Sequence, residues 1–392
     1  MHFPLPAPVE KALCMLTARG YEAYVVGGCV RDLLMGIAPH DYDICTGSMP
    51  EETKACFAGE RVIETGIQHG TVTVLMDGEP LEITTFRTDG DYLDGRHPSS
   101  VSFTRNIEND LMRRDFTVNA MAYHPQKGLV DLYCGQEDIR AKVLRCVGDA
   151  HTRLTEDALR ILRAVRFSAQ LDFAIEDATA QAMIDLKERL SLVSRERIAQ
   201  ELLRMIAYPA APKVLRQFDA VFFAALPQCK KIDVEALDAL PAGDPALRLA
   251  ALLHENGAEI AENALKSLKL STQFTQECLQ LIAHYDAVVT PRDVPLFMAK
   301  LGVEQFERLL LLQHNTLLLF DMQRALDDKL PLSIRELAVN GRDLMAEGAP
   351  AGPMIGEVLG KLHEAVLRRE VGNEQEKLLE MGRTLLSLSQ RK

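Results

Sequence analysis

The stretch YVVGGCVRD, residues 24–32, decides the fold of the first third of this chain. Its β-branched apolar residues predict a strand, its two glycines a tight turn, and Val30 to Met35 a short helix that ends at Gly36. A strand that passes through glycines into a helix start points backbone N–H groups at an anion. Arg31, in the first helical turn, would add a bidentate contact to phosphate. The pattern also fits an ordinary strand–helix turn with a surface arginine.

A pair of acidic residues follows this turn. Asp41 and Asp43 are separated by one residue, so in a strand both side chains would face the same side and share an ion such as Mg²⁺. Glu82, on the second strand of a hairpin predicted over residues 71–86, would be a third carboxylate. An isolated alternating pair is usually a solvated strand face. Next to a phosphate cradle, it predicts a metal-dependent site for phosphoryl transfer.

Residues 113–120, RRDFTVNA, place two cations, an acid and an amide in one short segment. The arginines suit a triphosphate, while Asp115 and Asn119 are able to hydrogen-bond sugar hydroxyls. The alternative is a charged helix start in which Asp115 is the cap and Phe116 packs inside.

Residues 156–167, EDALRILRAVRF, predict an amphipathic helix with Thr155 as its N-cap. Apolar positions gather on one side, and the opposite arc carries Asp157, Arg160, Arg163 and Arg166. An aspartate and an arginine together accept from and donate to the Watson–Crick edge of a base. An ordinary surface helix with one internal ion pair has the same spacing.

The rest of the 392-residue chain is different in character. Short β-rich runs dominate up to about residue 132, and helical patterns dominate after about residue 139, which predicts an α/β head of roughly 140 residues and a long helical remainder. The composition, 47% hydrophobic and 26% charged, excludes disordered and fibrous proteins. The sequence contains no run of 18 apolar residues, so no membrane-spanning helix is expected. The net charge of −12 argues against nonspecific attachment to nucleic acid. Eight cysteines without a Cys-x-x-Cys pair and no secretory signal predict reduced thiols in a cytoplasm.

Taken in order, these segments resemble one family. Residues 25–32, the Asp41/Asp43 pair, and residues 65–74, 82–87, 113–120, 156–167 and 194–198 are similar to the bacterial tRNA nucleotidyltransferases, the class II CCA-adding enzymes of the DNA polymerase β-like nucleotidyltransferase superfamily. The resemblance covers about residues 24–203. It implies an α+β head with a mixed sheet, followed by an all-α neck, body and tail in an elongated, seahorse-like architecture. The implied domains are a catalytic head at 1–140, a base-recognising neck at 141–206, a body at 207–330 and a tRNA-binding tail at 331–392.

The resemblance also implies a role for each candidate residue. The catalytic carboxylates are Asp41, Asp43 and Glu82, of which Asp41 and Asp43 hold Mg²⁺. The nucleotide-binding residues are Gly28, Arg31, Arg114, Asp115, Asp157, Arg160, Arg163 and Arg166. Among these, Asp157 and Arg160 act as an amino-acid template for CTP or ATP, and Glu156 steadies Arg160.

The implied reaction adds C, C and A to the 3′ end of tRNA from CTP and ATP, without a nucleic-acid template and with release of pyrophosphate. The implied enzyme is cytoplasmic, does not bind membranes, and is a monomer or a homodimer. Residues 87–98 resemble the flexible loop that CC-adding enzymes lack, so adenine addition is expected.

Four alternatives stay open at this stage. They are an A-adding enzyme, a poly(A) polymerase, an RNA-binding protein with an inactive head, and an additional phosphohydrolase site near His254. The last is disfavoured, since Glu255 stands where a metal-binding Asp is expected and no full set of histidines accompanies His254.

Overall fold

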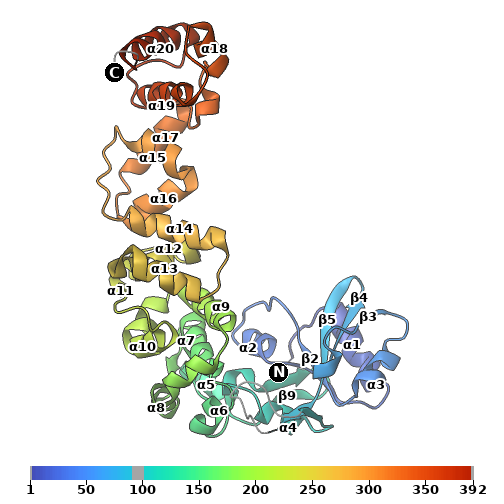
Figure 1. Ribbon diagram of the computed structural model, residues 1–392. Helices are drawn as coiled ribbons and strands as arrows, with labels where there is room; N and C mark the ends of the chain where they lie inside the picture. The colour runs from blue at the N-terminus through green and yellow to red at the C-terminus, as the bar shows by residue number, and fades with distance from the viewer. Residues whose placement is uncertain (1, 91–100, 390–392) are drawn as a thin grey trace. The chain divides into compact units, whose positions relative to one another are not determined.

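The computed structural model describes residues 2–90 and 101–389 and contains two compact units (Figure 1). The first unit comprises residues 1–230 with 267–269, and the second comprises residues 231–266 and 270–392. The segment 91–100, which includes most of the predicted flexible loop, lies outside the described residues.

A seven-stranded mixed sheet forms the centre of the first unit. The strand order is β3-β4-β5-β2-β1-β8-β9, and within this sheet only the β2–β5 pair is parallel. The strands are β1 (Ala23–Val26), β2 (Ile44–Thr46), β3 (Arg61–Ile63), β4 (Thr71–Met76), β5 (Glu79–Thr85), β8 (Met121–His124) and β9 (Gly128–Asp131). Two small sheets pair β6 (Arg87–Asp89) with β7 (Val101–Phe103) and β10 (Val143–Leu144) with β11 (Ala174–Ile175). The predicted hairpin is confirmed, with Asp77 and Gly78 as its two-residue turn.

Helices cover this sheet and extend the first unit. Those of the sheet region are α1 (Ala7–Thr17), α2 (Gly28–Leu34), α3 (Pro50–Cys56), η1 (Ile67–His69), α4 (Ile107–Met112), η2 (Thr117–Asn119) and α5 (Gly135–Ala141). Those that follow are α6 (Ala150–Glu156), α7 (Leu159–Leu171), α8 (Asp177–Leu186), η3 (Lys187–Leu192), α9 (Arg195–Ile206) and α10 (Ala211–Ala225). The predicted short helix after the glycine turn is therefore confirmed as α2.

Both faces of β1 are buried, which explains why this strand reads as a continuous apolar run. Ala23 and Val25 face the core that contains α1 and α2, while Tyr24 and Val26 face a second cluster with residues of α4. The first glycine turn is therefore fixed at the end of a fully buried strand.

The arginine-rich segment folds differently from the prediction. A single helix from Thr155 is wrong: α6 ends at Glu156, Asp157 is extended (φ −135°, ψ 105°), and α7 begins at Leu159. The Asp157 carboxylate accepts a hydrogen bond from the N–H of Leu159 (3.0 Å). It thus satisfies one of the backbone donors that have no partner within α7 at the start of this helix. The predicted apolar face is confirmed, and α7 packs against α9 and α10.

The second unit is helical throughout its described residues. Its elements are α11 (Val234–Asp238), α12 (Pro245–Leu253), η4 (His254–Asn256), α13 (Gly257–Ser267), α14 (Thr272–Ala283), α15 (Val294–Leu301), α16 (Val303–Leu312), α17 (Leu318–Asp327), η5 (Ile334–Glu336), α18 (Gly341–Ala346), α19 (Pro353–Leu367) and α20 (Gln375–Ser389). Among the described residues, no helix combines the length and hydropathy required to cross a membrane. The division into an α+β head and a helical remainder is thus confirmed, whereas the four-part domain boundaries stay a prediction.

Close packing of α5 on the sheet gives a test of the fold. A Cβ at Gly135 would lie 2.4 Å from the backbone oxygen of Thr117 and 2.8 Å from Sδ of Met121. Gly135→Ala is expected to lower the free energy of unfolding by about 1–3 kcal/mol, because the backbone of η2 must shift. Urea unfolding followed by circular dichroism measures this change.

Gly59→Ala is the matched control, because nothing lies within 4 Å of a Cβ there. It is expected to change stability by less than about 0.5 kcal/mol. Equal effects of the two substitutions would contradict the packing described for α5.

Candidate functional site

The three predicted carboxylates lie on or next to β2 and β5, two central strands of the sheet. Asp41 and Asp43 do not lie within a strand as predicted, because β2 begins at Ile44, but the backbone oxygen of Asp43 still accepts from the N–H of Val26 on β1 (3.0 Å). Ile44 is opposite Ile83 in the parallel β2–β5 pair, so Asp43 precedes β2 beside Glu82 of β5. All three carboxylates are exposed to solvent. They are accessible to a ligand.

Asp43 is close enough to Asp41 and Glu82 to be repelled by both carboxylates. The pKa of Asp43 is raised, first by desolvation although its side chain stays exposed, and then by repulsion from Asp41; Glu82 adds a smaller repulsion. The positive charge of Arg114 opposes this shift. A cation placed among the carboxylates would relieve the repulsion.

The carboxylates suit a hard divalent cation. Mg²⁺ is commonly held by one or two carboxylates together with substrate phosphates, rather than by a complete protein cage. The described part of the chain holds no cluster of three or more His, Cys, Asp or Glu side chains arranged for a metal ion. Asp41 and Asp43 are both exposed and close enough for their charges to repel, so they supply carboxylates of the kind that hold Mg²⁺.

The glycine turn lies against the same arginine. Gly27 has φ +83°, a conformation that other residues rarely adopt, and a Cβ there would lie 3.1 Å from Nη1 of Arg114. Arg31 is buried, and its guanidinium folds over Gly28 and bonds to Asp32 (Nε, 2.9 Å) and Asn119 (Nη1, 2.7 Å). Arg31 is thus a buried cation that is held beside the glycine turn. It is not the surface arginine of the alternative in which this segment is an ordinary strand–helix turn.

A polar pocket of about 260 Å³ brings together five of the eight predicted nucleotide-binding residues. Its lining is Arg113, Arg114, Asp115, Asp157, Leu159, Arg160, Arg163 and Arg197. Arg114 connects this pocket with the carboxylates. It lines the pocket, and its positive charge opposes the rise in the pKa of Asp43.

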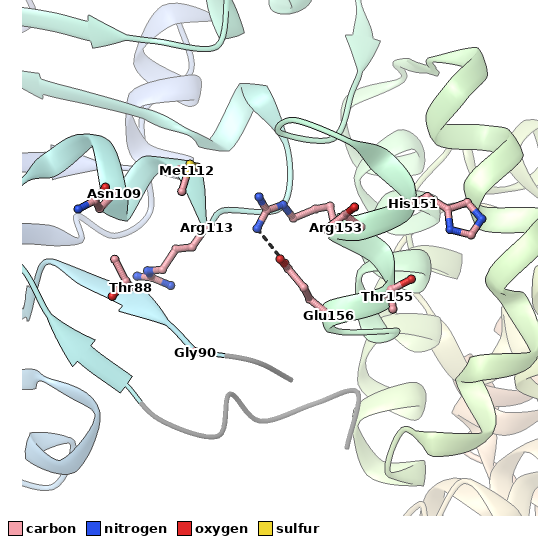
Figure 2. Close-up of a pocket in the computed structure, with 10 residues that line it drawn as sticks. Thr88, Gly90, Asn109, Met112, Arg113, His151, Arg153, Thr155 and Glu156 are labelled. Carbon is pink, nitrogen blue, oxygen red and sulfur yellow. Dashed lines mark hydrogen bonds and ion pairs between the residues drawn. The ribbon is translucent and has the colours of Figure 1, made fainter. Parts of the chain in front are cut away.

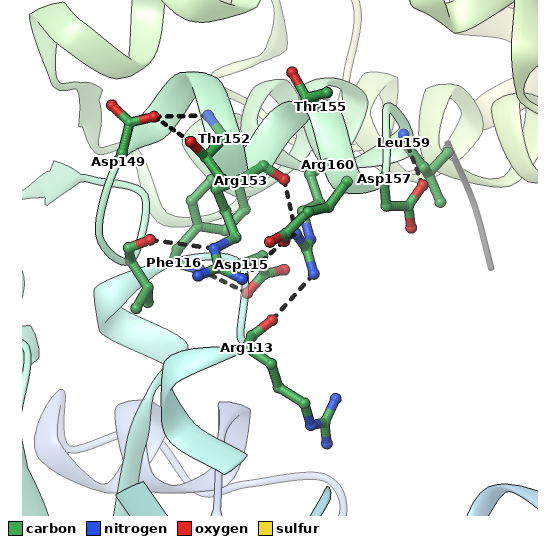
Figure 3. A network of polar contacts seen from close by, with 12 residues as sticks. Arg113, Asp115, Phe116, Asp149, Thr152, Arg153, Thr155, Asp157, Leu159 and Arg160 are labelled. Carbon is green, nitrogen blue, oxygen red and sulfur yellow. Dashed lines mark hydrogen bonds and ion pairs between the residues drawn. The ribbon is translucent and has the colours of Figure 1, made fainter. Parts of the chain in front are cut away.

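Arg160 is held rigidly at this pocket (Figure 3). Its Nη1 donates to the backbone oxygen of Arg153 (2.7 Å) and to the Glu156 carboxylate, and its Nη2 donates to the backbone oxygen of Arg113 (3.0 Å). Arg153 also bonds to Glu156 (2.8 Å). The predicted support of Arg160 by Glu156 thus has a direct contact in the structure.

Asp157 is held by a residue that the sequence analysis did not select. Arg197, at the start of α9, donates from Nη2 to Asp157 Oδ2 (3.0 Å) and lines the pocket. The Nη1 of Arg197 is buried without a hydrogen-bond partner. The segment 194–198 carried the signal, but only the fold shows that it meets Asp157.

Asp115 joins the sheet region to α7. Its carboxylate accepts two hydrogen bonds from Arg163 (2.6 and 2.8 Å), one from Asn119 and one from the N–H of Phe116. Burial pushes the pKa of Asp115 up, but the charge of Arg163 and these hydrogen bonds bring it down to about 2. The predicted capping role is absent, although Phe116 is fully buried as the alternative proposed.

Arg166 lies apart from the pocket lining. It is 6% exposed, its Nε donates to Glu201 of α9 (2.5 Å), and its guanidinium stacks 3.8 Å from the centre of the Phe167 ring. Arg166 does not line the pocket, but its guanidinium group lies over the Phe167 ring together with those of Arg31 and Arg163. Arg166 also shares the Glu201 carboxylate with Arg163. Its observed contacts fix α7 against α9.

Asp110 is a second residue that the sequence analysis missed. It is 1% exposed on α4 and accepts from Arg113 (2.7 Å) and Arg114 (3.1 Å). Its pKa is lowered, because attraction to the two guanidinium groups outweighs burial. Asp110 therefore orients both arginines of the RRD segment.

A larger cavity of about 600 Å³ shares Arg113 with the pocket (Figure 2). Thr88 of β6 and Asn109 and Met112 of α4 line one side, and residues of α6 line the other. Two adjacent spaces therefore share Arg113: the larger one is lined by α4, β6 and α6, and the smaller one by the segment 113–115, α7 and Arg197 of α9.

His254, the candidate for a phosphohydrolase site, has local partners in the second unit. Its Nε2 lies 2.9 Å from the Asp233 carboxylate, and its ring stacks on Tyr285 at 3.9 Å between centroids. The other candidate histidine, His284, contacts the backbone oxygen of Gln280 through Nδ1 (2.8 Å). Each ring is thus engaged within the helical packing.

Three family models match parts of the chain. They are the poly A polymerase head domain at residues 23–145, a probable RNA and SrmB-binding site of polymerase A at residues 172–220, and a putative tRNA nucleotidyltransferase domain 2 at residues 246–381. These matches cover the sheet region, the helices after α7 and most of the second unit.

Several curated relatives match nearly the whole chain. The CCA-adding enzyme of Lactobacillus delbrueckii subsp. bulgaricus is 39% identical over 377 residues, which are 93% of this chain and 94% of the relative. That of Geobacillus kaustophilus is 38% identical and covers 96% and 98% of the two chains. The crystal structure of the Bacillus stearothermophilus CCA-adding enzyme in complex with CTP is 30% identical, with a TM-score of 0.84 over 99% of this chain and 100% of that chain. The chain belongs to the family of CCA-adding enzymes, the nucleotidyltransferases that process tRNA.

Proposed function

We propose that this chain adds C, C and A to the 3′ end of tRNA from CTP and ATP, with each transfer releasing pyrophosphate. The observation that best supports this proposal is the pocket that Asp157 and Arg160 share with Arg114. The charge of Arg114 also opposes the rise in the pKa of Asp43, so the pocket lies close to the carboxylates. Relatives whose names state CCA addition match 93–96% of the chain. The solved relative with CTP supports the choice of nucleotide.

Base selection rests on Asp157 and Arg160. An aspartate accepts from and an arginine donates to the Watson–Crick edge, so the pair can replace a complementary base. Glu156 and two backbone oxygens immobilise Arg160, while Arg197 immobilises Asp157. The side chains thus have fixed positions before a nucleotide arrives, which favours selectivity.

Phosphate binding rests on the glycine turn and the arginines beside it. The N–H groups after Gly27 and the guanidinium groups of Arg31 and Arg114 would neutralise the triphosphate. We propose that Asp41 and Asp43, with Glu82 beside them, hold Mg²⁺, which would stabilise charge on the transferring phosphoryl group. The 3′-hydroxyl of the RNA attacks the α-phosphate, and the bond to the departing pyrophosphate breaks. The cavity of about 600 Å³ next to the pocket leaves room for the RNA end.

Two assigned roles change in detail within this proposal. Asp115 contributes by orienting Arg163 and Asn119, because its oxygens already accept four hydrogen bonds. Arg166 contributes by holding α7 to α9 through Glu201. Arg163, which lines the pocket and is about one-third exposed, keeps the proposed contact to nucleotide.

We place the enzyme in a cytoplasm, since all eight cysteines, which lie within the described residues, are free thiols. A monomer or a homodimer remains the proposed oligomeric state. An A-adding enzyme is the closest rival function, because it would use the same pocket.

Incorporation on three tRNA substrates tests the function directly. The substrates end before the first C, after CC, and after CCA, and CTP and ATP are supplied separately. We expect CTP to extend the first tRNA by two residues, ATP to extend the second by one, and neither to extend the third. Extension of the second substrate alone would indicate an A-adding enzyme, and repeated addition to the third a poly(A) polymerase. Binding without any extension would indicate an inactive head.

Asp41→Ala tests the carboxylate pair. Removal of one metal-binding carboxylate is expected to reduce incorporation by on the order of 10³-fold or more while tRNA affinity stays within about twofold. Primer extension measures the first quantity and filter binding the second. Glu79→Ala, which removes another exposed carboxylate of the same sheet, is the control and is expected to retain parental activity. Survival of incorporation in Asp41→Ala would refute the metal-binding role.

Arg160→Ala tests the amino-acid template. The ratio of kcat/KM for the correct nucleotide to that for an incorrect one is expected to fall by roughly 10–100-fold, since base-edge contacts are lost. Binding of tRNA is expected to change much less. Arg140→Ala, at an exposed position on α5, is the matched control. Unchanged fidelity in a folded Arg160→Ala variant would show that another group reads the base.

A further inference from the structure

The aromatic ring of Phe167, on α7, has three guanidinium groups around it. The central carbon of the guanidinium group lies 5.5 Å from the ring centroid for Arg31, 5.2 Å for Arg163 and 3.8 Å for Arg166. Phe167 is 7% exposed, and Arg31 and Arg166 are also buried. Three like charges therefore meet at one mostly buried ring in the first unit.

Each of these cations has a close carboxylate partner. The pairs are Arg31–Asp32 (2.8 Å), Arg163–Asp115 (2.6 Å) and Arg166–Glu201 (2.5 Å). The pKa of Arg166 is nevertheless lowered, first by desolvation and then by repulsion from Arg163, while Glu201 opposes both effects. One carboxylate for each cation balances the net charge, but repulsion between neighbouring cations remains.

The face of a phenylalanine ring attracts cations without adding a charge to the interior. Its π-electrons give the face a negative electrostatic potential, and the attraction for a guanidinium group is strongest where water is excluded. An aliphatic side chain of similar size would fill the same space without this attraction. The Phe167 ring is itself held in an edge-to-face contact with the buried Phe116, at 5.8 Å between centroids.

Two of the three cations are candidate nucleotide-binding residues from different elements. Arg31 belongs to α2, which follows the glycine turn, and Arg163 lines the pocket of about 260 Å³. Hydrogen bonds connect them as well. Arg31 donates to Asn119 (2.7 Å), which donates to Asp115 (3.2 Å), and Asp115 in turn accepts from Arg163. The ring and this chain of hydrogen bonds together fix the separation of Arg31 and Arg163.

We infer that Phe167 is a positioning residue for nucleotide binding, whose ring holds Arg31 and Arg163 at the separation at which both contact one nucleotide. This role rests on the proposed function, because that function makes a nucleoside triphosphate the ligand of both arginines. Phe167 lies outside the pocket lining, so it acts through the cations. Since CTP and ATP have the same triphosphate, loss of the ring's attraction weakens both nucleotides alike.

The test replaces Phe167 with mono-, di- and trifluorinated phenylalanine in the full chain. Fluorine withdraws electrons from the ring face, so the attraction for cations falls in steps while the size and apolar character of the side chain change little. We expect the Kd for CTP and for ATP to rise with each fluorine, by roughly 3–10-fold in total and by the same factor for both. KM for nucleotide is expected to rise likewise, while kcat stays within about twofold. Calorimetric titration and single-nucleotide extension measure these quantities.

The same fluorinated series at Phe57 is the matched control. Phe57 is fully buried in the core of the sheet region, and no cation among the described residues lies over its ring. Nucleotide affinity is expected to stay at the parental value throughout this series. An equal loss of affinity in the two series would overturn the inference, because it would reflect fluorine in the interior and not the cations.

Phe167→Leu separates attraction from packing. It removes the ring and is expected to weaken CTP and ATP at least as much as the trifluorinated side chain does. Weaker nucleotide binding in Phe167→Leu together with an unchanged affinity across the fluorinated series would overturn the inference, since the ring would then matter only as packing. A ratio of CTP to ATP affinity that changes with the number of fluorines would overturn it as well.

Direct binding measurements separate this role from the proposed reaction. If the parental protein extends no tRNA but binds CTP and ATP, and fluorination weakens that binding in steps, the role of the ring stands and the reaction fails. If extension is normal and fluorination leaves nucleotide affinity unchanged, the reaction stands and the role of the ring fails. A parental protein that binds neither nucleotide would refute both.

Discussion

The pairing of Asp115 with Arg163 is the contact on which the site depends. Asp115 belongs to the sheet region and Arg163 to α7, and the two hydrogen bonds between them, 2.6 and 2.8 Å long, cross from one to the other. An ionised carboxylate in this buried position is stable only while its partners remain, because an unpaired buried charge costs several kcal/mol. The pKa of about 2 expresses the same balance, in which attraction outweighs burial. The relative position of the sheet region and α7 is thus set by charge as well as by apolar packing.

Opposite charges are sorted into two groups around this contact. Exposed carboxylates collect on β5 and on the segment before β2, and guanidinium groups collect in the pocket. Arg114 lies between the groups, paired with Asp110 and close enough to affect Asp43. A nucleoside triphosphate needs both groups, since its phosphates are anions and the reacting phosphoryl group is stabilised by cations. The ion pair with Asp110 (3.1 Å) holds Arg114 in this position.

Local patterns in the sequence were sufficient for the elements but not for all of the contacts between them. The buried strand, the glycine turn, α2 and the β4–β5 hairpin follow from residues that are neighbours in the chain. The break at Asp157 was missed because the apolar spacing continues through it, and a carboxylate that caps α7 leaves no separate pattern. Arg197 and Asp110 were missed for other reasons. Arg197 matters through Asp157, which lies 40 residues away on another part of the fold. Asp110 instead pairs with Arg113 and Arg114, three and four residues further along the chain, and nothing in that local spacing shows that its carboxylate is buried.

The same reasoning explains why Arg160 and Arg166 separate although they share a helix face. Both are buried cations with a carboxylate partner, yet Arg160 donates to the backbone oxygen of Arg113 whereas Arg166 stacks on Phe167. Arg113 is therefore linked through its backbone to Arg160 and, through Asp110, to Arg114. A displacement of the segment 113–115 would move Arg160 and Arg114 together. If these arginines have the proposed roles, selection of the base and alignment of the phosphates are mechanically coupled, and a substitution that loosens one is expected to weaken the other.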